Sequence, residues 1–91
     1  MDIGATKIII PPNSAREVIG ILADHGIYWC GDCTYPLNDT AHAAANRADD
    51  NGNVTIRFDS MQQGASYYFY FGNRCDYTEI SVNKLIEILK Q

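Results

Sequence analysis

Three cysteines and two histidines are the side chains of this 91-residue sequence best suited to metal or thiol chemistry. Cys30 and Cys33 have the spacing of a zinc knuckle, and His42 and Cys75 would complete a set of four ligands. Strong zinc signatures contain two close pairs, whereas only one pair is close here. Reduced cysteines packed as small apolar side chains are the favoured interpretation. The sequence therefore predicts no cofactor and keeps zinc as an alternative.

The segment 29–33, Trp-Cys-Gly-Asp-Cys, resembles the Trp-Cys-Gly-Xaa-Cys motif of thioredoxin-like proteins, whose two thiols cycle between dithiol and disulfide. The resemblance covers this short segment alone and implies a redox enzyme with a helix that opens at the motif. Pro36 disfavours such a helix, and no later proline is available to lie beside the motif. The sequence also contains no phosphate loop, dinucleotide fingerprint or nucleophile paired with a base. It therefore predicts a protein that is not an enzyme.

The aromatic segment 65–71 predicts a strand that exposes tyrosines on one face. Because side chains alternate across a strand, Tyr68 and Tyr70 share a face opposite the phenylalanines. If this strand forms a hairpin with the alternating segment 54–59, charged residues of that segment join the tyrosines. Tyrosines beside mixed charges are typical of protein-binding surfaces, although cross-strand packing on a solvated face explains them equally well. The candidate partner-binding residues here are Tyr68, Tyr70, Arg57 and Asp59.

A second candidate surface is the segment 32–50, whose glycine, proline and asparagine residues predict a largely irregular conformation. Long segments of this kind are often functional, and a mobile insertion without a role is the alternative. Its candidate partner-binding residues are Tyr35, Asp32, Asp39, Asp49 and Asp50. A further alternative is an aromatic pocket at a dimer interface, lined by Trp29, Tyr35 and other tyrosines, which sequesters a small ligand.

Composition predicts one globular domain over residues 1–91, with 46% hydrophobic and 20% charged residues. The formal net charge of −4 and the scattered basic residues argue against direct nucleic-acid binding. The same mild acidity suits contact with a basic groove on a larger protein. No apolar run approaches the roughly 20 residues that span a bilayer, so no membrane association is predicted. The start of the chain does not have the pattern of a signal peptide, so a cytoplasmic location is expected.

Hydrophobic periodicity predicts an α+β fold in which a small two-layer sandwich packs an about four-stranded, mostly antiparallel sheet against two helices. The expected order is β-α-β-(α)-β-β-α. Strands are predicted at 7–10, 27–30, 54–59 and 65–71, helices at 14–26 and from 81 onward, and a two-turn helix or a loop at 40–47. Ser14 and Glu17 match a capping box, Gly26 suits the helix end, and Ser81 suits the start of the last helix. The turn cluster 49–53 carries the Asn-Gly signature of a hairpin.

In length, acidity, aromatic hairpin and short final helix, the whole chain resembles the small accessory proteins that bacteriophages encode, including anti-CRISPR and other anti-defence proteins. The resemblance is one of overall character and rests on no motif. It implies a protein that docks on a nuclease or effector in the host cytoplasm and occludes its substrate site. The sequence thus predicts a small acidic inhibitor of a larger protein, with a zinc-stabilised or ligand-sequestering module as the alternative. A homodimer is left open, because an aromatic edge strand can pair with its copy.

Overall fold

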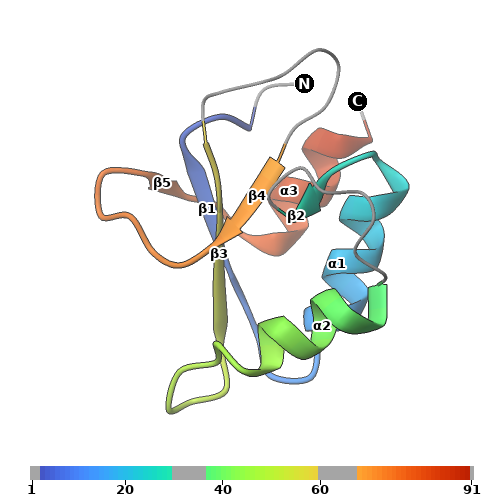
Figure 1. Ribbon diagram of the computed structural model, residues 1–91. Helices are drawn as coiled ribbons and strands as arrows, with labels where there is room; N and C mark the ends of the chain where they lie inside the picture. Colours follow the sequence, from blue (N-terminus) through green and yellow to red (C-terminus); the bar gives the residue numbers. More distant parts are fainter. Residues whose placement is uncertain (1–2, 30–36, 60–67, 91) are drawn as a thin grey trace.

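The computed structural model describes residues 3–29, 37–59 and 68–90, which form three helices and five strands (Figure 1). The strands are β1 (Thr6–Ile10), β2 (Tyr28–Trp29), β3 (Val54–Phe58), β4 (Tyr68–Phe71) and β5 (Thr78–Glu79). The helices are α1 (Ala15–Asp24), α2 (Leu37–Ala45) and α3 (Val82–Leu89). No helix within these ranges is long and apolar enough to cross a lipid bilayer.

The five strands form one mixed sheet in the order β2-β4-β3-β1-β5. Its centre is antiparallel, because β3 pairs with β1 on one side and with β4 on the other. Both edges are parallel, with β2 on β4 and β5 on β1. The α+β class is confirmed, but the expected four-stranded, mostly antiparallel sheet on two helices is a five-stranded mixed sheet on three. The added strand β5 is two exposed residues long, too short and too polar to produce a strand pattern in the sequence.

All three helices lie on one side of the sheet, and the alternation of β3 explains why (Figure 1). Val54, Ile56 and Phe58 are at most 3% exposed, whereas the residues between them are only half-buried. The expected inward placement of Phe69 is confirmed, and Phe71 is partly buried against the same core. The rest of the core is aliphatic and comes from β1, the helices and flanking residues: Ile3, Ile8, Ile10, Val18, Ile19, Leu22, Ile27, Ala44, Leu85 and Leu89. Each large side chain buried in this way stabilises the fold by about 1.5–3 kcal/mol.

Helix α2 resolves the ambiguity of the alanine-rich segment, which forms a helix from Leu37 onward rather than a loop. Its end is held by Arg47, whose guanidinium carbon lies 5.3 Å from the ring centre of Trp29 and 5.1 Å from that of Phe71. The two rings meet edge to face, with centroids 5.2 Å apart. Arginine over aromatic faces is a favourable cation–π arrangement. This contact fastens the end of α2 over the edge formed by β2 and β4.

The turn 49–53 forms as expected but does not connect two strands of a hairpin. It joins α2 to β3. The Asp49 carboxylate accepts hydrogen bonds from the backbone N–H groups of Asn51 at 2.8 Å and Asn53 at 3.0 Å. Gly52 has φ +83°, which a glycine adopts at low cost. The Asn-Gly sequence therefore identified the turn but not the element that precedes it.

Two of the predicted helix-terminal features are confirmed and one is wrong. Gly26 lies just past α1 with φ +76°, and Ser81 caps α3 by accepting a 3.0 Å hydrogen bond from the Lys84 N–H group. The Ser14 side chain makes no such bond, so the capping box with Glu17 does not form. The reason is the backbone of Ser14, which is helical (φ −108°, ψ −3°) rather than extended, as capping requires.

The two serines provide a matched test of helix capping. Ser81→Ala should lower the free energy of unfolding by about 0.5–2 kcal/mol, because it removes the acceptor of the Lys84 N–H group. Ser14→Ala should lower it by less, because no side-chain bond is lost. Urea denaturation of both variants measures the difference. Equal losses, or a larger loss for Ser14→Ala, would contradict the assignment of the cap to Ser81 alone.

Candidate functional site

The face of the sheet opposite the helices, called the outer face below, carries tyrosine, arginine and acidic side chains. Arg57 alternates with the buried residues of β3, and Tyr68 and Tyr70 flank the buried Phe69 on β4. All of these outer-face side chains are half-buried. None of the three described helices lies over this side (Figure 1). Among the described residues, neighbours within the sheet therefore shield these side chains.

Arg57 is at the centre of the outer face. Its guanidinium carbon lies 5.3 Å from the ring centre of Tyr70, which is directly opposite on β4. Its Nη1 donates a 3.0 Å hydrogen bond to the Phe71 carbonyl oxygen, and its buried Nε lies 3.4 Å from Asp59 Oδ1 without a well-directed hydrogen bond. Gly72, with φ +117°, permits this approach, because a Cβ there would lie 3.2 Å from Nη1. Three neighbours thus fix an Arg57 side chain that remains 23% exposed.

Asp59 connects β3 to the segment between β4 and β5. Its Oδ1 accepts a 2.5 Å hydrogen bond from the Tyr77 hydroxyl, which raises the pKa of that phenol. The Arg74 guanidinium lies over the Tyr77 ring at 4.9 Å and pairs with Asp76 at 3.0 Å. Its hydrogen bonds to the carboxylate lower the pKa of Asp76. A continuous chain of contacts therefore runs from Tyr70 to the exposed tip of the β4–β5 connection.

Lys7 holds the same connection from β1. Its Nζ donates to Asn73 Oδ1 at 2.6 Å and to the Arg74 carbonyl oxygen at 3.1 Å. The outer face and this connection carry three basic and three acidic residues: Lys7, Arg57, Arg74, Asp59, Asp76 and Glu79. Because the whole sequence has a formal net charge of −4, the acidic excess lies elsewhere.

The structure brings some of the predicted partner-binding residues together and separates others. Those that share the outer face are Tyr68, Tyr70, Arg57 and Asp59. Asp39 is exposed in the first turn of α2, whereas Asp49 and Asp50 are exposed in the turn before β3. Asp32 and Tyr35 lie outside the described residues. The expected largely irregular segment 32–50 thus contains a nine-residue helix, and its acidic residues belong to a helix start and a separate turn.

Five members of the outer-face network were not anticipated from the sequence: Lys7, Asn73, Arg74, Asp76 and Tyr77. The polar segment 73–77 directly after the aromatic strand was the available signal. Its meaning depends on the pairing of β5 with β1, which brings it beside Lys7 and Asp59. That pairing has no local signature in the sequence.

The zinc alternative is represented in the described residues by two side chains only. His42 is exposed on α2, and Cys75 is exposed between β4 and β5. These two segments lie on opposite sides of the sheet (Figure 1). The other proposed ligands, Cys30 and Cys33, lie outside the described residues. Within residues 3–29, 37–59 and 68–90, no group of three or more side chains is arranged to hold a metal ion.

The proposed aromatic pocket corresponds to a small cavity beside Trp29. Its volume is about 120 Å³, and its lining includes Tyr28, Phe69 and the buried Thr40. Ligand pockets usually measure roughly 300–1,000 Å³. The other tyrosines of the outer face do not line it.

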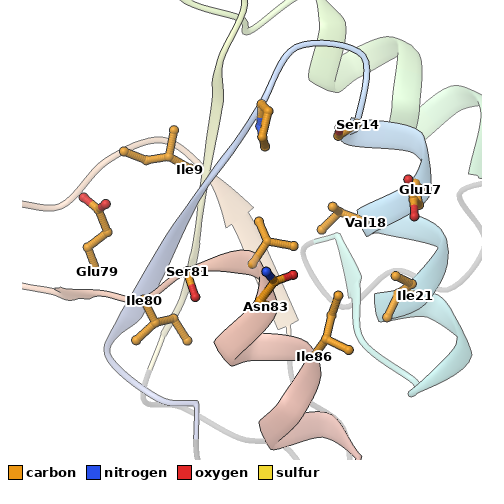
Figure 2. A pocket seen from close by; sticks show the side chains of 12 residues that line it. Ile9, Ser14, Glu17, Val18, Ile21, Glu79, Ile80, Ser81, Asn83 and Ile86 are labelled. Atoms are coloured by element: carbon orange, nitrogen blue, oxygen red, sulfur yellow. The ribbon is translucent and has the colours of Figure 1, made fainter.

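A larger depression lies at the edge of β1, between α1 and α3 (Figure 2). It is called the β1 groove below and has a volume of about 490 Å³. Aliphatic side chains from both helices line its centre, and Glu17 and Glu79 lie on opposite sides of it in Figure 2. Because its walls are far apart in the sequence, no local pattern indicates this groove.

Comparisons with known proteins find no relative that identifies the chain. No model of a protein family matches it. No curated protein and no solved structure matches it either.

The phenol of Tyr77 provides a test of the outer-face network. Because the Asp59 carboxylate favours the protonated phenol, the Tyr77 pKa lies above the usual value of about 10. The bond therefore contributes fully to stability when the pH is below the usual tyrosine pKa. Its contribution is lost as the pH rises through the higher pKa of the folded state. Absorbance titration of tyrosinate should show a late step from Tyr77 that Asp59→Ala shifts to lower pH. Tyr77→Phe should remove the same step, and a late step that persists in both variants would refute the assignment.

Proposed function

We propose that the chain is a small binding protein that docks on a larger protein through its outer face and occludes a site there. The observation that carries this proposal is the half-buried, fixed Arg57, which Tyr70, Asp59 and the Phe71 carbonyl hold on a face that none of the described helices covers. Arginine and tyrosine are enriched among residues that dominate the energy of protein interfaces. The outer face is therefore the surface best suited to a protein partner.

The fixed geometry of the outer face supports binding for an entropic reason. Ordering a long side chain at an interface costs about 0.5–1.5 kcal/mol. Arg57 is already ordered by contacts within the sheet, and Tyr77 by its bond to Asp59. A partner that packs against them therefore loses little of its binding energy to ordering these side chains.

The balanced charge of the outer face refines the expected partner. Three basic and three acidic residues suit a partner surface of mixed charge. A basic groove on the partner would instead meet the acidic residues elsewhere, such as Asp39, Asp49 and Asp50. We infer that the outer face provides the specific contacts and that the acidic excess assists the approach of a basic partner.

Inhibition of a defence effector of the anti-CRISPR kind is the specific form of this proposal. It rests on the overall likeness of the chain to small phage proteins and on an outer face that is available for docking. Self-association through a sheet edge is the competing use of the fold. The two edge strands, β2 and β5, are each two residues long, which limits strand pairing with a second copy.

Affinity capture from extracts of the source cells tests the proposal. Tyr68→Ser combined with Tyr70→Ser should reduce the captured partner by more than tenfold, because loss of interface hot spots costs about 2 kcal/mol or more. Glu87→Gln, at an exposed position of α3, should leave capture unchanged. Circular dichroism of each variant confirms that the fold persists. Equal capture by the tyrosine variant and the wild type would refute docking through the outer face.

A further inference from the structure

We propose that the β1 groove binds an extended, basic segment of a partner protein, with apolar side chains of that segment inserted between α1 and α3. The groove adjoins the outer face at Ile9 and Glu79, but its lining does not include Tyr68, Tyr70 or Arg57. Its volume of about 490 Å³ falls within the roughly 300–1,000 Å³ typical of ligand pockets.

The centre of the β1 groove is apolar. Ile80 precedes α3 and Ile21 lies on α1, and both are half-buried at the margin of the core. Ile9 on β1 lies at the rim rather than the centre: it is 41% exposed, and because it alternates with the buried Ile8 and Ile10, its side chain projects on the outer face. Figure 2 shows the side chains of α1 and α3 facing one another across the groove. The apolar lining is Ile9, Pro11, Val18, Ile21, Ile80, Val82 and Ile86. A contiguous apolar surface of this kind is often an interaction site.

The negative charge of the lining indicates that the bound segment is basic. Glu17 on α1 and Glu79 on β5 lie on opposite sides of the groove (Figure 2), and the lining includes no lysine or arginine. An apolar segment with basic residues on both sides complements this arrangement. A second copy of the chain is a poor occupant, because a two-fold interface would bring these carboxylates together between two chains that each carry a formal net charge of −4.

The backbone of β1 indicates that the bound segment is extended. The Thr55 carbonyl oxygen points toward β4, where it accepts a hydrogen bond from the Gly72 N–H group. Thr55 is therefore not hydrogen-bonded to Ile9, its partner on β1. The backbone N–H and C=O groups of Ile9 are therefore directed away from β3. On that side β5 ends at Glu79, and the last backbone bond runs from the Ile80 N–H group to the Lys7 carbonyl oxygen. An added strand can pair with Ile9 at this edge, as in recognition by strand addition.

Two synthetic peptides test this proposal directly. The first is a fluorescein-labelled peptide of alternating leucine and lysine, and the second replaces each lysine with glutamate. The basic peptide should bind and shift the amide NMR signals of Ile9, Ile21 and Ile80, whereas the acidic peptide should not. Added salt should weaken the binding, because the charged rim is exposed.

A pair of variants matched in net charge isolates the role of the groove carboxylates. Glu17→Lys with Glu79→Gln should weaken binding of the basic peptide by about twofold to thirtyfold, as expected for the loss of two exposed charge pairs. Glu79 becomes glutamine because a lysine there would face Lys7 across the strands. Glu87→Lys with Asp24→Asn changes the net charge equally but lies outside the groove, and it should leave the affinity within twofold.

Three results would overturn the proposal. These are failure of the basic peptide to bind, equal binding of both peptides, or amide shifts confined to residues outside the groove. Concentration-dependent dimerisation with shifts at the groove would show instead that a second copy occupies it, and would also overturn the proposal. Tyr68→Ser with Tyr70→Ser should retain peptide binding, so failure of the outer-face proposal and failure of the groove proposal give different results.

Discussion

The alternation of side chains along β3 is the constraint on which the rest of the structure depends. Val54, Ile56 and Phe58 are apolar and point to the same face of the strand. Because β3 is paired on both sides, it cannot rotate, so only that face can be buried. That requirement places the helices on this face and assigns Arg57 to the other. A shift of one residue in register would bury the guanidinium and expose the core residues. The binding chemistry proposed for the outer face is thus fixed by the same pattern that forms the core.

The outer face is ordered by contacts within the sheet, and none of the helices in residues 3–29, 37–59 and 68–90 lies over it. Arg57 and Asp59 make contacts to β4 and to the β4–β5 connection, so side-chain interactions replace the packing that a helix would supply. Exposed ion pairs of this kind are individually weak. Their value lies in geometry, because they hold aromatic and charged groups in one arrangement. The β1 groove meets this surface only at Ile9 and Glu79, and its lining contains acidic but no basic residues.

The sequence was sufficient for features set by local patterns and insufficient for those set by long-range pairing. The alternation at 54–58 predicted the faces of β3, and Ser81 predicted the start of α3. The same kind of pattern failed at Ser14, whose backbone conformation prevents the expected cap. Strand β5 was missed because two exposed residues contain no periodicity. Tyr77 and the groove at the edge of β1 were missed for the same reason, because both depend on the position of β5. Both surfaces require segments that meet only after the sheet has assembled.

The parallel pairing of β5 with β1 also has a consequence for how the chain acquires its structure. The Lys7 side chain bonds to Asn73, 66 residues further along the chain. Contacts between such distant positions slow folding, because a long loop must close before any stabilisation is gained. During synthesis on the ribosome, β1 emerges before β5, so the edge at Thr6 and Lys7 has no partner strand until almost all of the described chain has been made. The strand that completes the sheet is therefore also the last to arrive, and until then the backbone edge of β1 at Thr6 and Lys7 is accessible to chaperones.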